Sequence, residues 1–201
     1  MMDVRETVLH AAAIKRNSGA EEIAGITGLT QAEVDAELSH AVETGRAMDS
    51  GGKFIVSPLA DVALRSRYSL HFGDLRTNER FVAAYEGFEQ VNATLKQVIT
   101  DWQTMSVGGQ SVANDHSDPA HDEKIIDRLG NVHEQVEPLI NRLAESLPRL
   151  KIYETKLLEA LERAEDGEHE WVSDIRRESY HTIWFELHED LLRIMGRERE
   201  E

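Results

Sequence analysis

The chain has 201 residues, of which 40% are hydrophobic and 30% charged, and its formal net charge is −16. This composition is typical of a globular protein and excludes a disordered chain. The absence of cysteine excludes disulfides, thiolate metal sites and cysteine nucleophiles. No apolar run approaches the roughly 20 residues of a membrane span, and the first residues lack a signal-peptide pattern. We therefore expect a cytoplasmic protein with no membrane partner.

The negative charge is concentrated in the C-terminal two-thirds. Residues 1–72 carry seven Lys/Arg against ten Asp/Glu, whereas residues 73–201 carry 15 against 28. A surface this acidic repels phosphate backbones and anionic membranes. Any contact with nucleic acid is therefore expected in the N-terminal part.

The N-terminal third predicts three helices, a β-hairpin and a further helix. Thr30 and Glu33 form a capping-box pattern at the start of the third helix. Gly51-Gly52 is a tight-turn signal between two short extended runs, and Pro58 suits the first position of the next helix. The predicted ranges are 3–16, 20–26 and 30–45 for the helices, and 46–50 and 53–57 for the strands.

The string IAGITGLTQAEVDAELSHAVETGRAM, residues 23–48, resembles the helix-turn-helix of MarR-type winged-helix regulators. In that family a Thr-Gly-Leu turn precedes a helix patterned Val-x-x-x-Leu and a closing glycine. The resemblance covers about a third of the chain. It implies a winged helix-turn-helix domain over residues 1–72 and a transcriptional regulator that binds double-stranded DNA.

The predicted recognition helix is acidic, which disfavours DNA. Residues 30–44 contain four carboxylates and no Lys or Arg, although phosphate contacts normally dominate affinity. Two interpretations stay open: DNA binding with help from flanking cations, or a winged helix that docks a protein or a second copy. The DNA-binding candidates are Lys15, Arg16, Thr30, Gln31, Arg46 and Lys53.

The remaining residues, 75–201, predict an acidic antiparallel helical bundle that senses a signal or mediates dimerisation. Four segments carry apolar residues at alternating spacings of three and four. A glycine-rich segment, 106–111, is interpreted as a flexible break, and Pro138 predicts a kink. The fold class is therefore mainly α, with a short β-wing. The predicted helices are 75–104, one from Asp118-Pro119 through Leu143, 150–164 and 172–196.

The seam of the first bundle helix suggests a homodimer. Large aromatic residues line it from Phe81 to Trp102, and Asn92 in the middle is the kind of polar residue that sets register between paired helices. A two-fold dimer would use this helix together with residues 58–70. The alternative is that the seam is the core of one monomer's bundle.

Two polar stretches, 114–122 and 179–190, are rich in histidine and aspartate. One hypothesis is that they converge on a pocket for a small acid or a divalent metal, with Trp184 in its wall. The alternative is that the aspartates cap helices and the histidines satisfy buried polar groups. The chain has no His-Glu-x-x-His run that would support a particular metal, and no cofactor is required. The ligand-binding candidates are His116, Asp118, His121, His181, Trp184 and His188.

The same two stretches resemble a small group of MarR-like proteins, and through them pyruvate, phosphate dikinase-type proteins, which use phosphoenolpyruvate. This resemblance implies an alternative function, a winged-helix adaptor or regulatory partner of such an enzyme. The division into a small N-terminal and a larger helical part is also similar to GntR-type regulators. The chain itself has no glycine-rich phosphate loop, serine elbow or kinase signature. We therefore expect a regulatory protein and not an enzyme.

Overall fold

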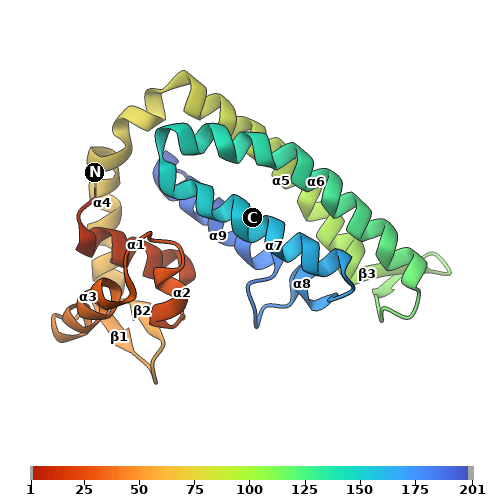
Figure 1. Cartoon of the computed structure of the whole chain (residues 1–201), viewed down its shortest axis with the longest axis horizontal. Coiled ribbons are helices and arrows are strands. Elements are labelled where there is room, and N and C mark those ends of the chain that lie inside the picture. Colours follow the sequence, from red (N-terminus) through yellow and green to blue (C-terminus); the bar gives the residue numbers. More distant parts are fainter. Residues whose placement is uncertain (1, 199–201) are drawn as a thin grey trace. The chain divides into compact units, whose positions relative to one another are not determined.

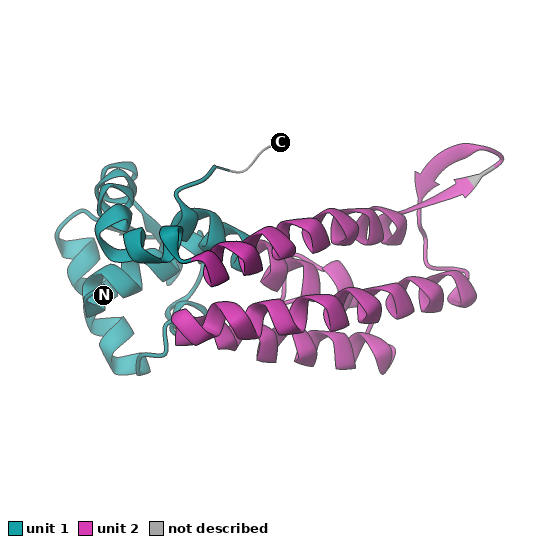
Figure 2. Ribbon diagram, turned by 90° about the horizontal axis from the view of Figure 1, so that it is seen from above, with its two compact units in different colours: residues 1–78, 186–201 teal, residues 79–185 magenta. Residues whose placement is uncertain are grey.

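The computed structural model describes residues 2–198, which divide into two compact units (Figures 1 and 2). Unit 1 comprises residues 2–78 and 186–198, and unit 2 comprises residues 79–185. The described residues are mainly helical, with two small antiparallel sheets. The division differs from the predicted one, because the second half of the last helix belongs with the N-terminal elements. Within residues 2–198, no helix is long and apolar enough to span a membrane.

Unit 1 contains three helices, a β-hairpin and a long fourth helix. The Thr30 hydroxyl accepts a hydrogen bond from the Glu33 backbone N–H, and the Glu33 carboxylate accepts one from the Thr30 N–H. The Ser57 side chain caps the fourth helix, which begins at Pro58. The elements are α1 (Val4–Lys15), α2 (Ala20–Ala24), α3 (Gln31–Glu43), β1 (Ala47–Asp49), β2 (Phe54–Val56), α4 (Pro58–Thr77) and the second half of α9 (Tyr180–Met195).

The core of unit 1 forms where α1, α2 and α3 meet. Val8, Ile23 and Leu38, one from each helix, are fully buried. The hairpin closes beside them, with Ala47 opposite Val56 in the antiparallel register. The core thus orients α3 so that its other face is exposed to solvent.

Unit 2 is built around α5 and α6, which run side by side (Figure 1). A β-carbon on Gly87 of α5 would lie 2.9 Å from the Leu139 side chain of α6, so the absence of a side chain lets the two helices approach closely. α6 continues through Pro138 and packs against α7. The elements are α5 (Glu79–Gln103), β3 (Thr104–Val107), β4 (Gln110–Ala113), α6 (Pro119–Ser146), η1 (Pro148–Leu150), α7 (Lys151–Glu165), α8 (Glu170–Ser173) and the first residues of α9.

The segment interpreted as a flexible break is a β-hairpin instead. β3 and β4 pair antiparallel from Thr104 opposite Ala113 to the turn at Gly108-Gly109. Both glycines have positive φ, 58° and 81°, the conformation that a two-residue hairpin turn requires. Figure 2 shows the hairpin extending beyond the helices of unit 2.

The last predicted helix also begins later than expected. α8 ends at Ser173, and α9 begins only at Tyr180. The Asp174 carboxylate accepts hydrogen bonds from the Arg176 backbone N–H, at 2.9 Å, and from its guanidinium. Such a local side-chain-to-backbone bond competes with helix formation, which interrupts the predicted segment 172–196.

Candidate functional site

The exposed face of α3 is acidic and its polar side chains bond to one another. The Thr30 hydroxyl donates a hydrogen bond to Glu33 at 2.7 Å, and the Gln31 amide donates one to Asp35 at 2.9 Å. Glu43 is exposed at the end of the helix. The DNA-binding candidates Thr30 and Gln31 are therefore engaged by carboxylates of their own helix.

The four flanking cations do not share one environment. Lys15 is buried, and its ammonium lies 2.9 Å from the Glu186 carboxylate of α9. Arg16 and Lys53 are exposed, and Arg46 is half-buried. A phosphate could reach Lys15 only if this buried ion pair were broken, so three of the four cations are accessible.

A polar face of α9, which begins in the polar stretch 179–190 and continues to Arg193, packs against α1 and α4 within unit 1. Glu186, Asp190 and Arg193 have the spacing i, i+4 and i+7 and therefore lie on one side of the helix. They pair respectively with Lys15 at 2.9 Å, His10 Nε2 at 2.9 Å and Asp61 at 2.8 Å. The spacing could have indicated a polar helix face, but it does not indicate which residues pair with that face.

The pKa values of Tyr68 and Asp61, which belong to this network, are shifted in opposite directions. Burial raises the pKa of Tyr68 to about 12, against the opposing effect of the nearby Arg193 guanidinium. Burial also raises the pKa of Asp61, but hydrogen bonds from Arg193 and Arg65 outweigh it, so the net shift is downward. The Tyr68 hydroxyl lies 2.8 Å from His10 Nδ1. Asp61 is therefore charged and Tyr68 neutral near pH 7, as expected for a structural polar network.

In unit 2, residues 114–122 do form a cluster. Asp122 is almost fully buried, and one of its oxygens lies 2.9 Å from His116 Nδ1. The Asn114 amide donates a hydrogen bond to the other oxygen at 2.9 Å. The ring of Trp102 lies 4.5 Å from the His116 ring, and His169 Nδ1 approaches the same carboxylate at 3.9 Å. Sequence reasoning missed His169, which lies in the loop after α7 and has no distinguishing pattern.

The side chains of Asp118 and Trp184 have other partners. Asp118 caps α6 by accepting from the backbone N–H groups of Ala120 and His121. Trp184 is buried in unit 2, donates to Asn92 at 3.0 Å and stacks on Phe88. His181 belongs to unit 2 and the buried His188 to unit 1.

The structure thus brings His116 together with Asp122 and His169. His116 is not brought together with His181, because the hydrogen bonds, ion pairs and ring contacts of His116 are made with Asn114, Asp122 and Trp102. Among residues 2–198, no group of three or more histidines and carboxylates could hold a metal ion.

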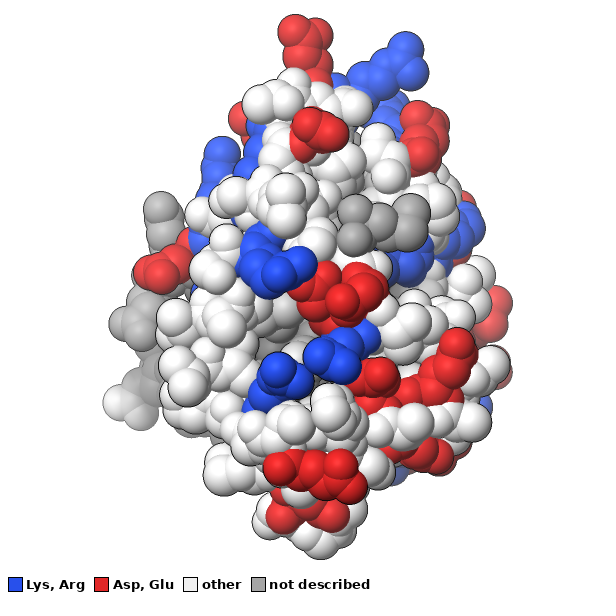
Figure 3. All heavy atoms as spheres, turned by 90° about the vertical axis from the view of Figure 1, so that its left-hand side faces the viewer, with Lys and Arg blue, Asp and Glu red and all other residues white. Residues whose placement is uncertain are grey.

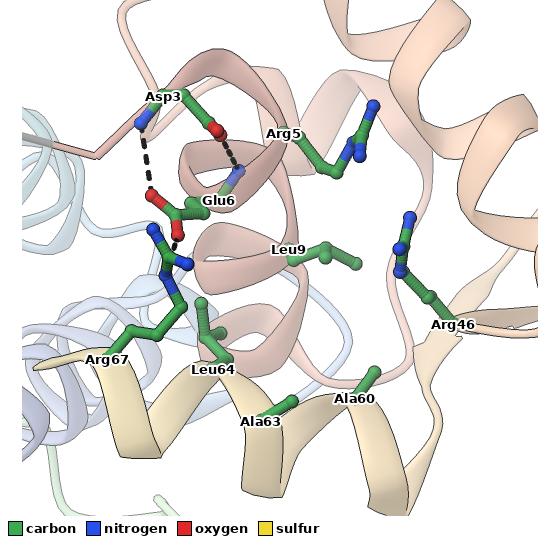
Figure 4. A pocket seen from close by; sticks show the side chains of 9 residues that line it. All are labelled: Asp3, Arg5, Glu6, Leu9, Arg46, Ala60, Ala63, Leu64 and Arg67. Atoms are coloured by element: carbon green, nitrogen blue, oxygen red, sulfur yellow. Dashed lines mark hydrogen bonds and ion pairs between the residues drawn. The ribbon is translucent and has the colours of Figure 1, made fainter.

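Unit 1 also has a pocket of about 250 Å³, lined by α1, α4 and the residue before β1 (Figure 4). Three arginines surround it: Arg5, Arg46 and Arg67. Arg67 pairs with Glu6, whereas Arg5 and Arg46 extend into the same space from the other side. Figure 3 shows side chains of both charge signs alternating across one face of the molecule. Arg46 was predicted only as a DNA-binding candidate, and no pattern in the sequence indicated the pocket.

Comparisons of the chain with known protein families, with curated proteins and with solved structures found no match.

Proposed function

We propose that this chain is a regulatory protein whose N-terminal elements, α1 to α4 with the β1–β2 hairpin, form a winged helix-turn-helix that docks a protein partner. The order of helix, helix, helix, hairpin and helix supports the winged-helix assignment. The single observation that carries docking, as opposed to DNA reading, is the acidic exposed face of α3.

Charge determines what α3 can bind. Its outward carboxylates would face phosphates if the helix entered a major groove, and like charges repel. The burial of Lys15 removes one of the cations that would compensate. A protein surface rich in Lys and Arg is complementary to the same helix, which favours such a partner.

Docking can be tested with a photo-crosslinking residue in place of Ser39 on the exposed face of α3, in cells of the source organism. We expect a protein adduct that disappears in the variant Glu33→Gln/Asp35→Asn and persists in the matched control Glu159→Gln/Glu162→Gln on α7. An adduct that is unchanged by loss of the α3 carboxylates contradicts the proposal.

The second candidate is a DNA-binding repressor, favoured by the exposed Arg16 and by Lys53 in the hairpin turn. Fluorescence anisotropy with labelled genomic duplexes of about 30 base pairs, at about 50 mM salt, separates the two. Docking predicts no sequence-preferring binding at micromolar protein. Specific binding that is lost in Arg16→Ala/Lys53→Ala would establish the repressor and refute docking as the function.

We further propose that the protein is a homodimer formed through α4. Leu59, Val62 and Leu70 are exposed by 81%, 64% and 77%, and they lie on one face of the helix. If two copies of α4 cross antiparallel at Ser66, Val62 faces Leu70 of the second copy and Leu59 faces Gly73. Large residues then lie opposite small or apolar ones, so the face is complementary to itself, as a two-fold interface must be.

A further inference from the structure

The pocket in Figure 4 has cations with unused hydrogen-bonding capacity at one side. Glu6 contacts Arg67 and lies 3.0 Å from His71 Nε2, and the Asp3 carboxylate beside it accepts the Glu6 backbone N–H. Arg5 is 46% exposed, and its Nε lies 3.5 Å from a Glu37 oxygen, which leaves the rest of its guanidinium available. Arg46 has no ion-pair or hydrogen-bond partner for its side chain among residues 2–198.

The wall between these charged groups is apolar and aliphatic. Leu9 of α1 and Ala60, Ala63 and Leu64 of α4 form it, and none of the pocket-lining side chains among residues 2–198 is aromatic. Its volume of about 250 Å³ corresponds to about eight water molecules, at roughly 30 Å³ each. An apolar wall with a few convergent charged groups is the usual composition of a small-ligand site.

We propose that this pocket binds a short aliphatic monocarboxylate of about six carbons. The carboxylate lies between Arg5 and Arg46, because a guanidinium matches the geometry of a carboxylate and can donate two parallel hydrogen bonds. The alkyl chain lies along Leu9, Ala63 and Leu64. The inference goes beyond the proposed function, because binding of an acid requires neither a docked protein nor DNA.

The negative charge of the chain opposes the binding of an anion in this pocket at long range. A chain of net charge −16 repels small anions at long range. Binding therefore depends on short-range contacts with Arg5 and Arg46 and should weaken little when salt screens the overall field. Both arginines come from unit 1, so the site is complete without other parts of the chain.

Isothermal titration of the full chain with hexanoate and with hexanamide, its neutral analogue, tests the proposal. We expect hexanoate to bind. Hexanamide should bind at least about tenfold more weakly, because its neutral amide cannot form the charge-assisted hydrogen bonds of a carboxylate. Arg46→Ala should weaken hexanoate binding by about tenfold or more. It should still fold, since the bonds of Arg46 to Ala41 and Ser57 are made by its backbone. Arg5→Gln should weaken binding as well, and Lys53→Ala, an exposed cation outside the pocket, should leave it unchanged.

Backbone amide shifts in ¹⁵N-labelled protein locate the ligand and should change at Leu9 and Ala63. The proposal is overturned if no acid from butyrate to octanoate produces heat or shifts up to about 10 mM. It is also overturned if Arg46→Ala binds hexanoate as the wild type does, or if hexanamide binds equally well. Tighter binding of benzoate than of hexanoate would overturn the aliphatic assignment.

Discussion

Single residues show how strongly unit 1 depends on buried charge. Lys15 and Glu186 have side chains only 2% and 8% exposed, so each needs the other's charge. Removal of one partner from such a pair leaves an uncompensated buried charge, which costs far more than the net contribution of the intact pair. The exposed pair of Arg163 and Glu159 follows the opposite rule, because water screens it.

We therefore expect Lys15→Met to lower the free energy of unfolding by about 3 kcal/mol. The double variant Lys15→Met/Glu186→Leu should recover most of this loss, since neither charge of the pair remains. Arg163→Ala, the surface control, should change stability by less than about 1 kcal/mol. Urea unfolding followed by circular dichroism measures all three. A Lys15→Met loss no larger than that of the control would show that water reaches the pair.

The shifted pKa of His133 makes the stability of the fold depend on pH. Burial lowers the pKa of His133 below 6.5, although nearby carboxylates, Glu137 first among them, oppose the shift. Above pH 6.5 the imidazole is neutral in both the folded and unfolded chain, and its contribution to stability is complete. As the pH falls below 6.5, the unfolded chain takes up a proton that the folded chain resists, so this contribution is lost.

The melting temperature should accordingly fall less between pH 7.5 and 5.5 in His133→Gln than in the wild type. Glutamine is neutral throughout and can still hydrogen-bond the Tyr180 hydroxyl, which lies 3.4 Å from His133 Nδ1. Scanning calorimetry across this pH range checks the difference. An identical pH profile for the two proteins would assign the acid sensitivity to other groups.

At the scale of elements, local signals in the sequence were sufficient and distant ones were not. The helices over 3–16, 20–26 and 30–45 were predicted within a few residues, because capping residues and apolar spacing act within a turn or two of the chain. The contact between His10 and Asp190 joins residues 180 positions apart. No periodicity encodes such a pairing, which is why the attachment of α9 to unit 1 was missed.

In the histidine site, too, contacts between residues close in sequence could be predicted, and contacts between distant residues could not. His116 and Asp122 lie six positions apart on either side of a helix start, so their proximity was within reach of sequence reasoning. The convergence expected between residues 114–122 and His181 required knowledge of the tertiary arrangement. Trp184, assigned to a pocket wall, belongs to the core because its ring stacks between Phe88 and Tyr180.

The β3–β4 hairpin shows a local signal that was misinterpreted and supplies a test. Gly51-Gly52 predicted a turn, whereas the equivalent Gly108-Gly109 was interpreted as flexibility. Positive φ at position 108 strains a residue with a β-carbon by about 1–2 kcal/mol, but asparagine tolerates it better. Gly108→Val should therefore speed amide hydrogen exchange across residues 104–113, and Gly108→Asn should leave it near wild type. Equal exchange in both variants would mean that the turn does not hold the strands together.

At the scale of the whole molecule, the seam that first suggested a dimer is occupied. Phe81, Phe88 and Trp102 are buried, and Asn92 accepts the indole N–H of Trp184. These side chains therefore supply the core of one chain. The exposed apolar residues of α4 remain as the surface on which a second copy would pack, which moves the proposed dimer from α5 to α4.

This dimer predicts a clear response to charge. Leu70→Asp places a carboxylate opposite Val62 of the second copy, and a buried charge without a partner is strongly unfavourable. We expect light scattering to give a dimer mass for the wild type at micromolar concentration and the mass of one chain, 22.7 kDa, for Leu70→Asp. Because residue 70 is 77% exposed in the single chain, the variant should keep its helical content, which circular dichroism verifies.

Leu158→Asp, an exposed apolar position on α7, is the matched control and should remain dimeric. A wild type of monomer mass, or dissociation by the control as well, would rule out α4 as the interface.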